Sequence, residues 1–234
     1  MESAIKNHFQ ALTDAIRRTR TKRPVVNYDM EVVKKQITAI GNGYIRDFKI
    51  DEYNVKQIEN IIRYFYFDPN FEGEPEKGLL LIGPKGTGKT LIMVIMQKLL
   101  TMLKKQFMVD GYDENCNTFG IEPTHRITAA YESTGHPGIM KYTEKNIFCF
   151  DDLGEEEKLC KYYTNEINVM AKVLTDRYFN FVTKALITHA TSNYPLVDTK
   201  TEAHYYLDFY GARVEDRMTE MFNVIVFKGN SRRK

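Results

Sequence analysis

The chain has 234 residues, of which 43% are apolar and 27% are charged, and its net charge is only +2 because 33 Lys and Arg residues oppose 31 Asp and Glu residues. This mixture is typical of one large globular domain and excludes a disordered chain. The three cysteines lack metal-type spacing, and no run approaches the roughly 18 apolar residues of a membrane span. Because the first residues, MESAIKNHFQ, also lack a signal-peptide core, we expect a cytoplasmic protein without a membrane partner.

The N-terminal part of the chain favours helices. Residues 1–23 are expected to form a polar helix with an apolar stripe at Ile5, Phe9, Leu12 and Ile16. The basic run at 17–23 is either a solvated helix end or an arm that docks a partner or touches nucleic acid. A second helix is expected over 30–40, stopped by glycines at 41 and 43. We therefore expect a helical N-terminal segment over residues 1–45, which could dock a partner, and the main domain over 46–234.

Strand and helix patterns alternate from residue 78 onward. Short apolar or β-rich runs predict strands at 78–82, 125–130, 147–150, 185–191 and 224–227. Helical spacing of apolar residues predicts helices over 91–103 and 166–181. Five strands separated by helices indicate an α/β fold, a five-stranded parallel sheet with helices on both faces.

A complete Walker A motif, GPKGTGKT, follows the first strand and opens the next helix. Its glycines allow backbone N–H groups to converge on phosphate oxygens, and the helix directs its positive end at the same anion. The motif predicts ATP binding, with Lys89 at the β- and γ-phosphates and the Thr90 hydroxyl on Mg²⁺. The residues expected to bind the nucleotide here are Gly83, Pro84, Lys85, Gly86, Thr87, Gly88, Lys89, Thr90 and Leu91.

Two carboxylates stand where the strand at 147–150 ends. In a parallel sheet this end lies beside the phosphate loop, so Asp151 is expected to bind Mg²⁺ and Asp152 to orient or deprotonate the attacking water. Glu155 is the alternative base. Glu156 and Glu157 continue the acidic run, and we expect them to be solvated.

Polar residues near two further segments complete the predicted site. Asn193 follows the strand at 185–191 and could hold the attacking water by its amide. Arg213 and Arg217 are four residues apart and would share one helix face. Either arginine could stabilise charge on the transferred phosphoryl group, or both could pair within the helix with Glu215, Asp216 or Glu220.

The motifs together resemble AAA+ ATPases of the DnaC/IstB type. The segments GLLLIGPKGTGKT, IFCFDDLGEEE, LTDRYFNF, HATSNYP and YGARVEDRMTEMFNVIVFKGNSRR occur in the order found in this family, and the resemblance covers residues 45–234. It implies that Asp151 and Asp152 are Walker B and Asn193 is sensor I. Many AAA+ proteins carry Glu where this chain has Asp152, so the base remains either Asp152 or Glu155.

The resemblance also assigns roles to arginines. Arg217 corresponds to the arginine finger that acts on ATP in a neighbouring subunit, with Arg213 as the second choice. Arg233 corresponds to the sensor II arginine, with Arg232 one position away. Arg177, in the LTDRYFNF segment, is expected to face a subunit interface.

The implied function is that of an ATP-hydrolysing DNA replication protein, a helicase loader that binds single-stranded DNA and a replicative helicase and forms a homo-oligomer with ATP. An IstB-like transposition helper, which binds duplex DNA and a transposase, shares the same ATP residues and stays open. A P-loop nucleotide kinase is a third alternative. It would need an arginine-rich lid, and none is evident between Asp151 and Asn193.

Overall fold

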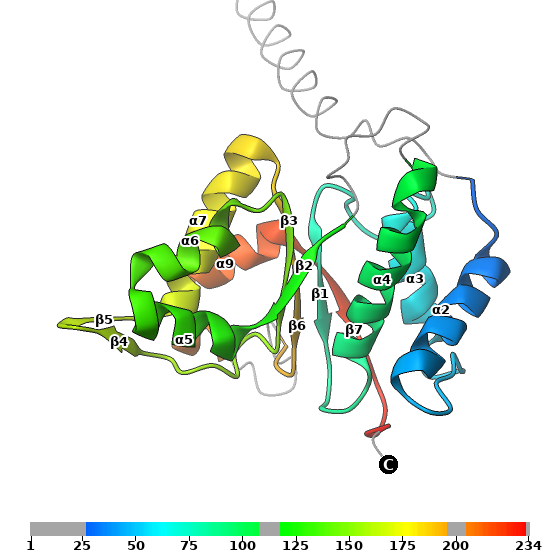
Figure 1. The fold of residues 1–234 in the computed structure, drawn as a ribbon, viewed down its shortest axis with the longest axis horizontal. Helices are drawn as coiled ribbons and strands as arrows, with labels where there is room; N and C mark the ends of the chain where they lie inside the picture. Colours follow the sequence, from blue (N-terminus) through cyan, green and yellow to red (C-terminus); the bar gives the residue numbers. More distant parts are fainter. Residues whose placement is uncertain (1–26, 108–117, 196–204, 233–234) are drawn as a thin grey trace, which may run out of the picture.

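The computed structural model describes residues 27–107, 118–195 and 205–232. Figure 1 shows a central sheet with helices on both sides. The helix and basic run expected within residues 1–23 lie outside the described residues. In chain order the elements are α2 (Met30–Tyr44), α3 (Val55–Phe65), β1 (Gly78–Ile82), α4 (Lys89–Phe107), β2 (Gly120–Pro123), α5 (Thr124–Thr134), α6 (His136–Glu144), β3 (Ile147–Asp151), β4 (Cys160–Tyr162), β5 (Asn165–Ile167), α7 (Val169–Lys184), β6 (Ile187–Ser192), α8 (Tyr205–Tyr210), α9 (Ala212–Met221) and β7 (Phe222–Val226).

The main sheet has five strands in the order β2-β3-β6-β1-β7, and every neighbouring pair is parallel. In the centre, Leu80 of β1 stands opposite Ala190 of β6 and Val224 of β7. The predicted fold class is therefore confirmed. Since β6 lies between β1 and β3, the loops that leave these three strands emerge side by side at the lower edge of the sheet in Figure 1.

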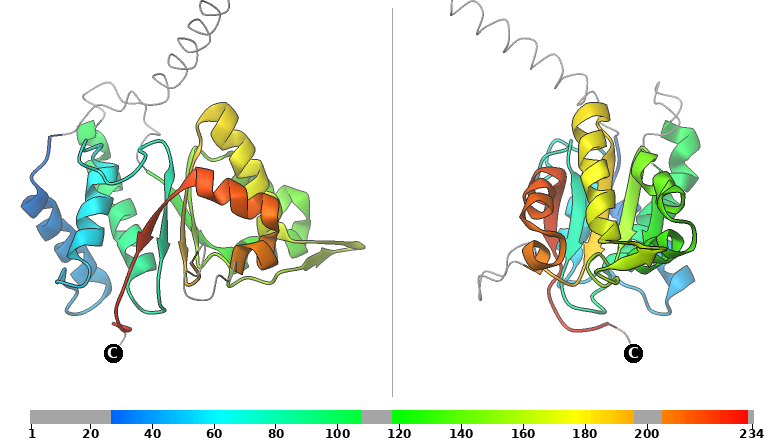
Figure 2. Two further views of the ribbon diagram at one scale, coloured as in Figure 1. Left: turned by 180° about the vertical axis from the view of Figure 1, so that it is seen from behind. Right: turned by 90° about the vertical axis from the view of Figure 1, so that its left-hand side faces the viewer.

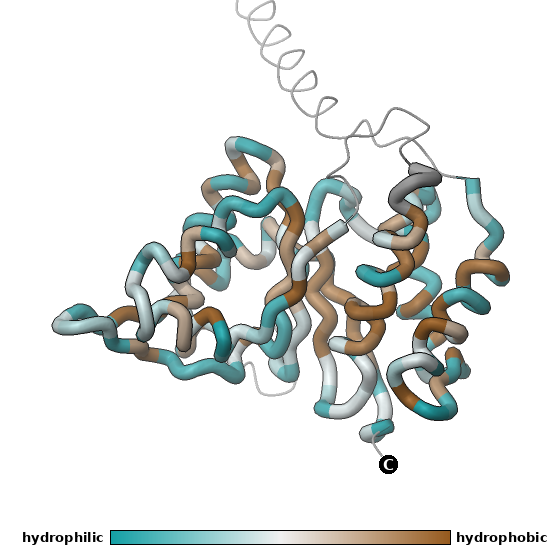
Figure 3. The backbone as a smooth tube through the Cα atoms, viewed as in Figure 1, coloured by the Kyte–Doolittle hydropathy of each residue, from teal (hydrophilic) through white to brown (hydrophobic). Residues whose placement is uncertain are grey.

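Successive side chains of a strand point to opposite faces of the sheet, and the interior is therefore divided into two hydrophobic cores. Leu79 and Leu81 of β1 join α2, α3 and α4 on one face, whereas Leu80 and Ile82 join α5 to α9 on the other. The apolar strands run through the middle of the molecule in Figure 3, and polar segments lie outside. Each fully buried leucine contributes about 1.5–3 kcal/mol to folding, so the four apolar positions of β1 hold both layers together.

A separate two-stranded hairpin, β4–β5, extends away from the body of the protein (Figure 2). Near its turn, the ring of Tyr162 packs against Gly135 at the corner between α5 and α6. The views of Figure 2 also place α9 next to α7, and both helices supply buried side chains to one core. Among the described residues, no helix is both long and apolar enough to cross a membrane.

The strand expected at 125–130 is wrong. Residues 124–134 form helix α5, and the corresponding edge strand, β2, precedes it at 120–123. Ile127 and Tyr131 are four residues apart and both are buried in the core, which is the spacing of a helix face. The six-residue window was too short to distinguish this period from that of a strand.

Helix α2 continues through the glycines that were expected to end it. Gly41 is buried inside the helix, where a Cβ atom would overlap the ring of Phe48. Its role is close packing rather than termination. Val33 and Ile37 of the same helix belong to the core beneath the sheet. The domain boundary near residue 45 stays a prediction, but α2 packs as part of the ATPase-like body.

The expectation that Arg177 faces a subunit interface is also wrong. Its side chain is 0% exposed, between α7 and the sheet. Its guanidinium donates to the carbonyl oxygens of Lys145 and Ile187, and its Nε donates to Thr188 Oγ1 at 2.8 Å. Burial lowers the pKa of Arg177 to about 10. The arginine therefore ties α7 to β6 from inside the protein.

Arg177→Ala should lower the free energy of unfolding by about 2–4 kcal/mol, because it leaves two buried acceptors and one part-buried acceptor without their donor. The matched control is Arg126→Ala on α5, whose exposed side chain pairs with Glu122 and should matter by less than about 0.5 kcal/mol. Urea denaturation of both variants measures the difference, and equal effects would contradict a structural role for Arg177.

Candidate nucleotide-binding site

The phosphate loop connects β1 to α4 through residues 83–88. Gly83 and Gly86 have φ angles of 145° and 82°, in the region that favours glycine. A Cβ atom at Gly83 would overlap the Phe227 carbonyl oxygen, and one at Gly86 would overlap Ser231 Oγ. The loop therefore needs glycine at these positions for two reasons, its backbone conformation and the close approach of the C-terminal segment.

Lys89 opens α4 and is buried beneath the loop. Its Nζ donates to the carbonyl oxygens of Gly83 and Pro84 at 2.7 and 3.0 Å, and to Asn193 Oδ1 at 3.0 Å. The ammonium group thus lies at the centre of the phosphate loop. It also connects the loop to the residue that follows β6.

Asp151 ends β3 and is 6% exposed. Its Oδ1 accepts from the Thr90 hydroxyl at 2.7 Å and from the Thr191 hydroxyl at 2.6 Å. The Thr90 hydroxyl and this carboxylate oxygen are close enough to serve as neighbouring ligands of one Mg²⁺, which binds hard oxygens at about 2.0–2.1 Å. Within the described part of the chain, no group of three or more His, Cys, Asp or Glu residues could hold a metal. Phosphate and water oxygens would therefore have to complete the shell.

Asp152 and Glu155, the two candidate bases, have opposite electrostatic environments. Burial and the neighbouring Asp151 raise the pKa of Asp152. In contrast, the hydrogen bond from Asn193 Nδ2 and contact with Lys85 lower the pKa of Glu155. The pKa values of the two carboxylates are therefore shifted in opposite directions. The left-handed backbone of Asp152, with φ at 55°, is held by a hydrogen bond of 3.0 Å from its N–H to Thr191 Oγ1.

Glu155 connects three of the predicted residues. Its Oε1 accepts from Asn193 Nδ2 and its Oε2 accepts from Lys85 Nζ, each at 3.0 Å. Since Asn193 Oδ1 accepts from Lys89, a continuous chain runs from Lys89 through Asn193 and Glu155 to Lys85. The structure thus brings together the phosphate loop, the acidic strand end and the asparagine, as the order of the strands requires.

Two residues of this region were not identified from the sequence. Thr191 is fully buried and orients both Asp151 and Asp152, but in the sequence it is only the last residue of a strand. Glu156 was expected to be solvated and is instead 6% exposed. It accepts from the Gly154 N–H at 2.9 Å and from the Tyr210 hydroxyl. Nothing local could have indicated this burial, because Tyr210 is 54 residues away.

The arginines of α9 lie elsewhere. Arg213 is exposed, and the Arg217 guanidinium stacks over the Tyr178 ring of α7 with its carbon 4.8 Å from the ring centroid. The Tyr178 hydroxyl in turn donates to Glu220 at 3.0 Å. Arg217 thus lies at the α7–α9 contact rather than beside the phosphate loop of its own chain.

The C-terminal segment contacts the phosphate loop directly. The Arg232 N–H donates to the Gly86 carbonyl oxygen at 2.9 Å, and its guanidinium pairs with Asp51 at 2.6 Å. Arg233, the predicted sensor II residue, lies outside the described residues. The backbone contact nevertheless brings this end of the chain to the candidate site.

Asp152→Asn should stabilise the protein slightly at pH 7. Because the folded state raises the pKa of Asp152, ionisation of this carboxyl costs stability as pH rises above its ordinary value of 3.8. Asparagine removes the charge and tolerates the left-handed backbone. The gain should stay below about 1 kcal/mol because the side chain is half-exposed and water screens the repulsion. Urea denaturation should show the gain at pH 7 and a smaller one near pH 4, whereas a less stable variant at pH 7 would contradict the argument.

Comparison with known proteins identifies the fold. The sequence matches no family model and no curated protein. Among solved structures, DnaI is 22% identical over 80% of this chain and 88% of its own, with a TM-score of 0.52. A DnaC helicase loader is 19% identical over 78% of this chain and 95% of its own, with a TM-score of 0.51. A putative primosome component from Streptococcus pyogenes serotype M3 is 17% identical over 78% and 84%, with a TM-score of 0.50. The chain therefore shares the fold of these three structures, the DnaC helicase loader among them, in agreement with the resemblance that its motifs predicted.

Proposed function

We propose that this protein binds and hydrolyses ATP and acts in DNA replication as a helicase loader of the DnaC type. The observation that carries the proposal is the convergence of Lys89, Asp151 and Asn193, which leave three neighbouring strands and meet at one phosphate loop. A buried cation, a carboxylate beside a hydroxyl, and an amide are the groups that phosphoryl transfer needs.

Binding would use groups already in position. The N–H groups of the glycine-rich loop and the N-terminus of α4 favour an anion, and Lys89 would exchange its carbonyl partners for phosphate oxygens. Thr90 and Asp151 would hold Mg²⁺, which neutralises phosphate charge when bound. Leu91 follows on the same helix turn and completes the predicted binding segment.

For the hydrolytic step, we assign the base to Asp152. Both oxygens of Glu155 already accept hydrogen bonds, whereas burial and Asp151 raise the pKa of Asp152 above its ordinary value. Glu155 would then orient Asn193, whose amide would position the attacking water. Of the two bases that the motif left open, we thus propose Asp152, with Glu155 as the alternative.

The arginine that completes the site would come from a second copy of the chain. Arg217 stacks on Tyr178 at the α7–α9 contact, away from its own phosphate loop, which supports action between subunits. Arg213, four residues earlier and exposed, is the second choice. Hydrolysis would then depend on assembly of a homo-oligomer in the ATP state, with Arg233 contributing as sensor II.

The proposed partners are a replicative helicase and single-stranded DNA. Their support is the fold that this chain shares with a DnaC helicase loader, together with the DnaC/IstB-type motif order. Binding of duplex DNA and a transposase instead would favour the transposition helper. Titration of the protein with single- and double-stranded oligonucleotides, with ATP and with ADP, distinguishes the two.

Lys89→Ala should reduce ATP affinity at least about 100-fold, because it removes the cation at the centre of the loop and the lost contacts are charge-assisted. Asp152→Asn should instead bind ATP normally and lose turnover. Calorimetric titration and phosphate-release assays separate these outcomes. Glu155→Gln is the matched control, expected to retain more turnover than Asp152→Asn. Normal ATP binding by Lys89→Ala would contradict the proposed function.

Arg217→Ala should leave ATP affinity of the isolated chain unchanged and reduce concentration-dependent hydrolysis by about 10³-fold, the lower end for arginine fingers. Mixing it with Lys89→Ala should restore part of the activity, since one chain then supplies an intact ATP site and the other an intact arginine. Arg213→Ala under the same conditions should have the smaller effect. Absence of rescue would argue against action between subunits.

A further inference from the structure

Helix α8 is joined to the segment that follows the Walker B strand. Tyr205, its first residue, donates from its hydroxyl to the Gly154 carbonyl oxygen at 2.7 Å. The Tyr205 ring also stacks on Tyr194, with ring centroids 3.7 Å apart and planes within 3°. Gly154 packs against this pair of rings and has a φ angle of 93°. The aromatic pair therefore fixes the chain three residues beyond Asp151.

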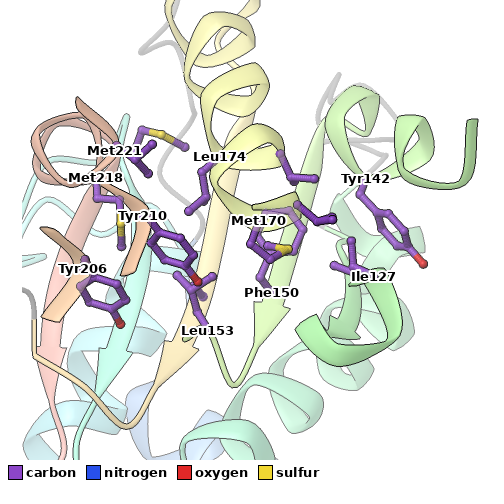
Figure 4. Close-up of a cluster of buried hydrophobic side chains, with 14 of the residues drawn as sticks. Ile127, Tyr142, Phe150, Leu153, Met170, Leu174, Tyr206, Tyr210, Met218 and Met221 are labelled. Atoms are coloured by element: carbon purple, nitrogen blue, oxygen red, sulfur yellow. The ribbon is translucent and has the colours of Figure 1, made fainter. Parts of the chain in front are cut away.

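The second tyrosine reaches the same segment through a serine. Tyr206 is fully buried, and its hydroxyl donates to Ser192 Oγ at 2.5 Å. Ser192 Oγ donates in turn to the Leu153 carbonyl oxygen at 2.6 Å. Figure 4 shows Tyr206 and Tyr210 beside Leu153 in the core. Because Ser192 directly precedes Asn193, this contact ties the ends of β3 and β6 to one helix.

The third tyrosine holds the buried glutamate. The Tyr210 hydroxyl donates to Glu156 Oε1, and the Gly154 N–H donates to Glu156 Oε2 at 2.9 Å. Glu156 thus closes residues 154–156 into a tight turn. A buried carboxylate is costly unless it is hydrogen-bonded, so loss of the tyrosine hydroxyl would weaken this turn directly.

Two side chains from residues 158–168, which come after the 154–156 turn, also hold α8 in place. Lys158 Nζ donates to the Asp208 carbonyl oxygen, and Asn168 Nδ2 donates to the Phe209 carbonyl oxygen, each at 2.7 Å. These contacts satisfy carbonyl groups at the end of α8 that have no partner inside a helix. Helix α8 and residues 153–168 are consequently joined from both sides.

We propose that Tyr210 and Glu156 are positioning residues for ATP hydrolysis, and this inference rests on the proposed function. Asp152 and Glu155 lie on either side of Leu153 and Gly154, the residues that the α8 tyrosines hold. The Tyr210–Glu156 bond keeps the 154–156 turn closed. It thereby sets where the Asp152 carboxylate stands and where Glu155 presents its oxygens to Asn193. The hydrogen bond that the two residues share lies at the 154–156 turn and not in the phosphate loop, so their effect should fall on turnover and leave nucleotide binding largely unchanged.

The test compares Tyr210→Phe, Glu156→Gln and the double variant by kcat and by the Kd for a non-hydrolysable ATP analogue. Tyr210→Phe should lower kcat about tenfold, as expected for loss of a hydrogen bond to a charged group, and change Kd less than about threefold. The double variant should lose no more than the worse single variant, because the two residues act through one bond. Tyr142→Phe, which alters a buried tyrosine of α6 on the same core, is the control and should keep normal kcat.

A second readout needs no hydrolysis. Amide hydrogen exchange of Gly154, followed by NMR in the nucleotide-free protein, should be at least about tenfold faster in Tyr210→Phe than in wild type or Tyr142→Phe. If wild type binds ATP without hydrolysing it, the proposed function fails, and the Gly154 exchange still reports whether the bond holds the turn. The positioning role is overturned if Tyr210→Phe has normal kcat, or if kcat, affinity for the ATP analogue and global stability all decrease together.

Discussion

The candidate site depends on one carboxylate oxygen that accepts two hydroxyl hydrogen bonds. Asp151 Oδ1 accepts one hydrogen bond from the Thr90 hydroxyl, near the start of α4, and one from the Thr191 hydroxyl, near the end of β6. Three segments far apart in sequence are thereby fixed at one point at the edge of the sheet. Hydrogen bonds to a charged acceptor are stronger than neutral ones, so these two bonds stabilise the junction.

Two carboxylates close to that junction, Asp152 and Glu155, have pKa values that are shifted in opposite directions. Burial raises the pKa of Asp152, and the neighbouring carboxylate of Asp151, held by its hydroxyl donors, raises it further. Glu155, only three residues later, accepts from Asn193 and Lys85, and its pKa falls. The surroundings of these two carboxylates on one short segment thus shift their pKa values in opposite directions. We propose that Asp152 acts as base and that Glu155 orients the amide of Asn193.

Two charged residues outside the strands, Arg177 and Glu156, are buried and have structural roles. Arg177 and Glu156 have charged side chains of the kind that usually face water, yet each is nearly or fully buried. Arg177 binds carbonyl and hydroxyl oxygens between α7 and β6, and Glu156 binds a tyrosine and a backbone N–H. Both join the frame that supports the site. Arg217, by contrast, is only partly buried and stacks on Tyr178 at the surface of the two packed helices.

The sequence alone determined the parallel sheet, the phosphate loop and the meeting of Lys89, Asp151 and Asn193, because glycine spacing, apolar runs and strand-end carboxylates are local signals. Only the tertiary structure decided that residues 124–134 are helical, that Arg177 is buried and that Glu156 is not solvated. Each of these depends on partners from distant segments, such as Tyr210 for Glu156 and Thr188 for Arg177. From sequence alone a charged residue is predicted to be exposed, because its burial depends on segments that are distant in the chain and pack around it only in the folded protein.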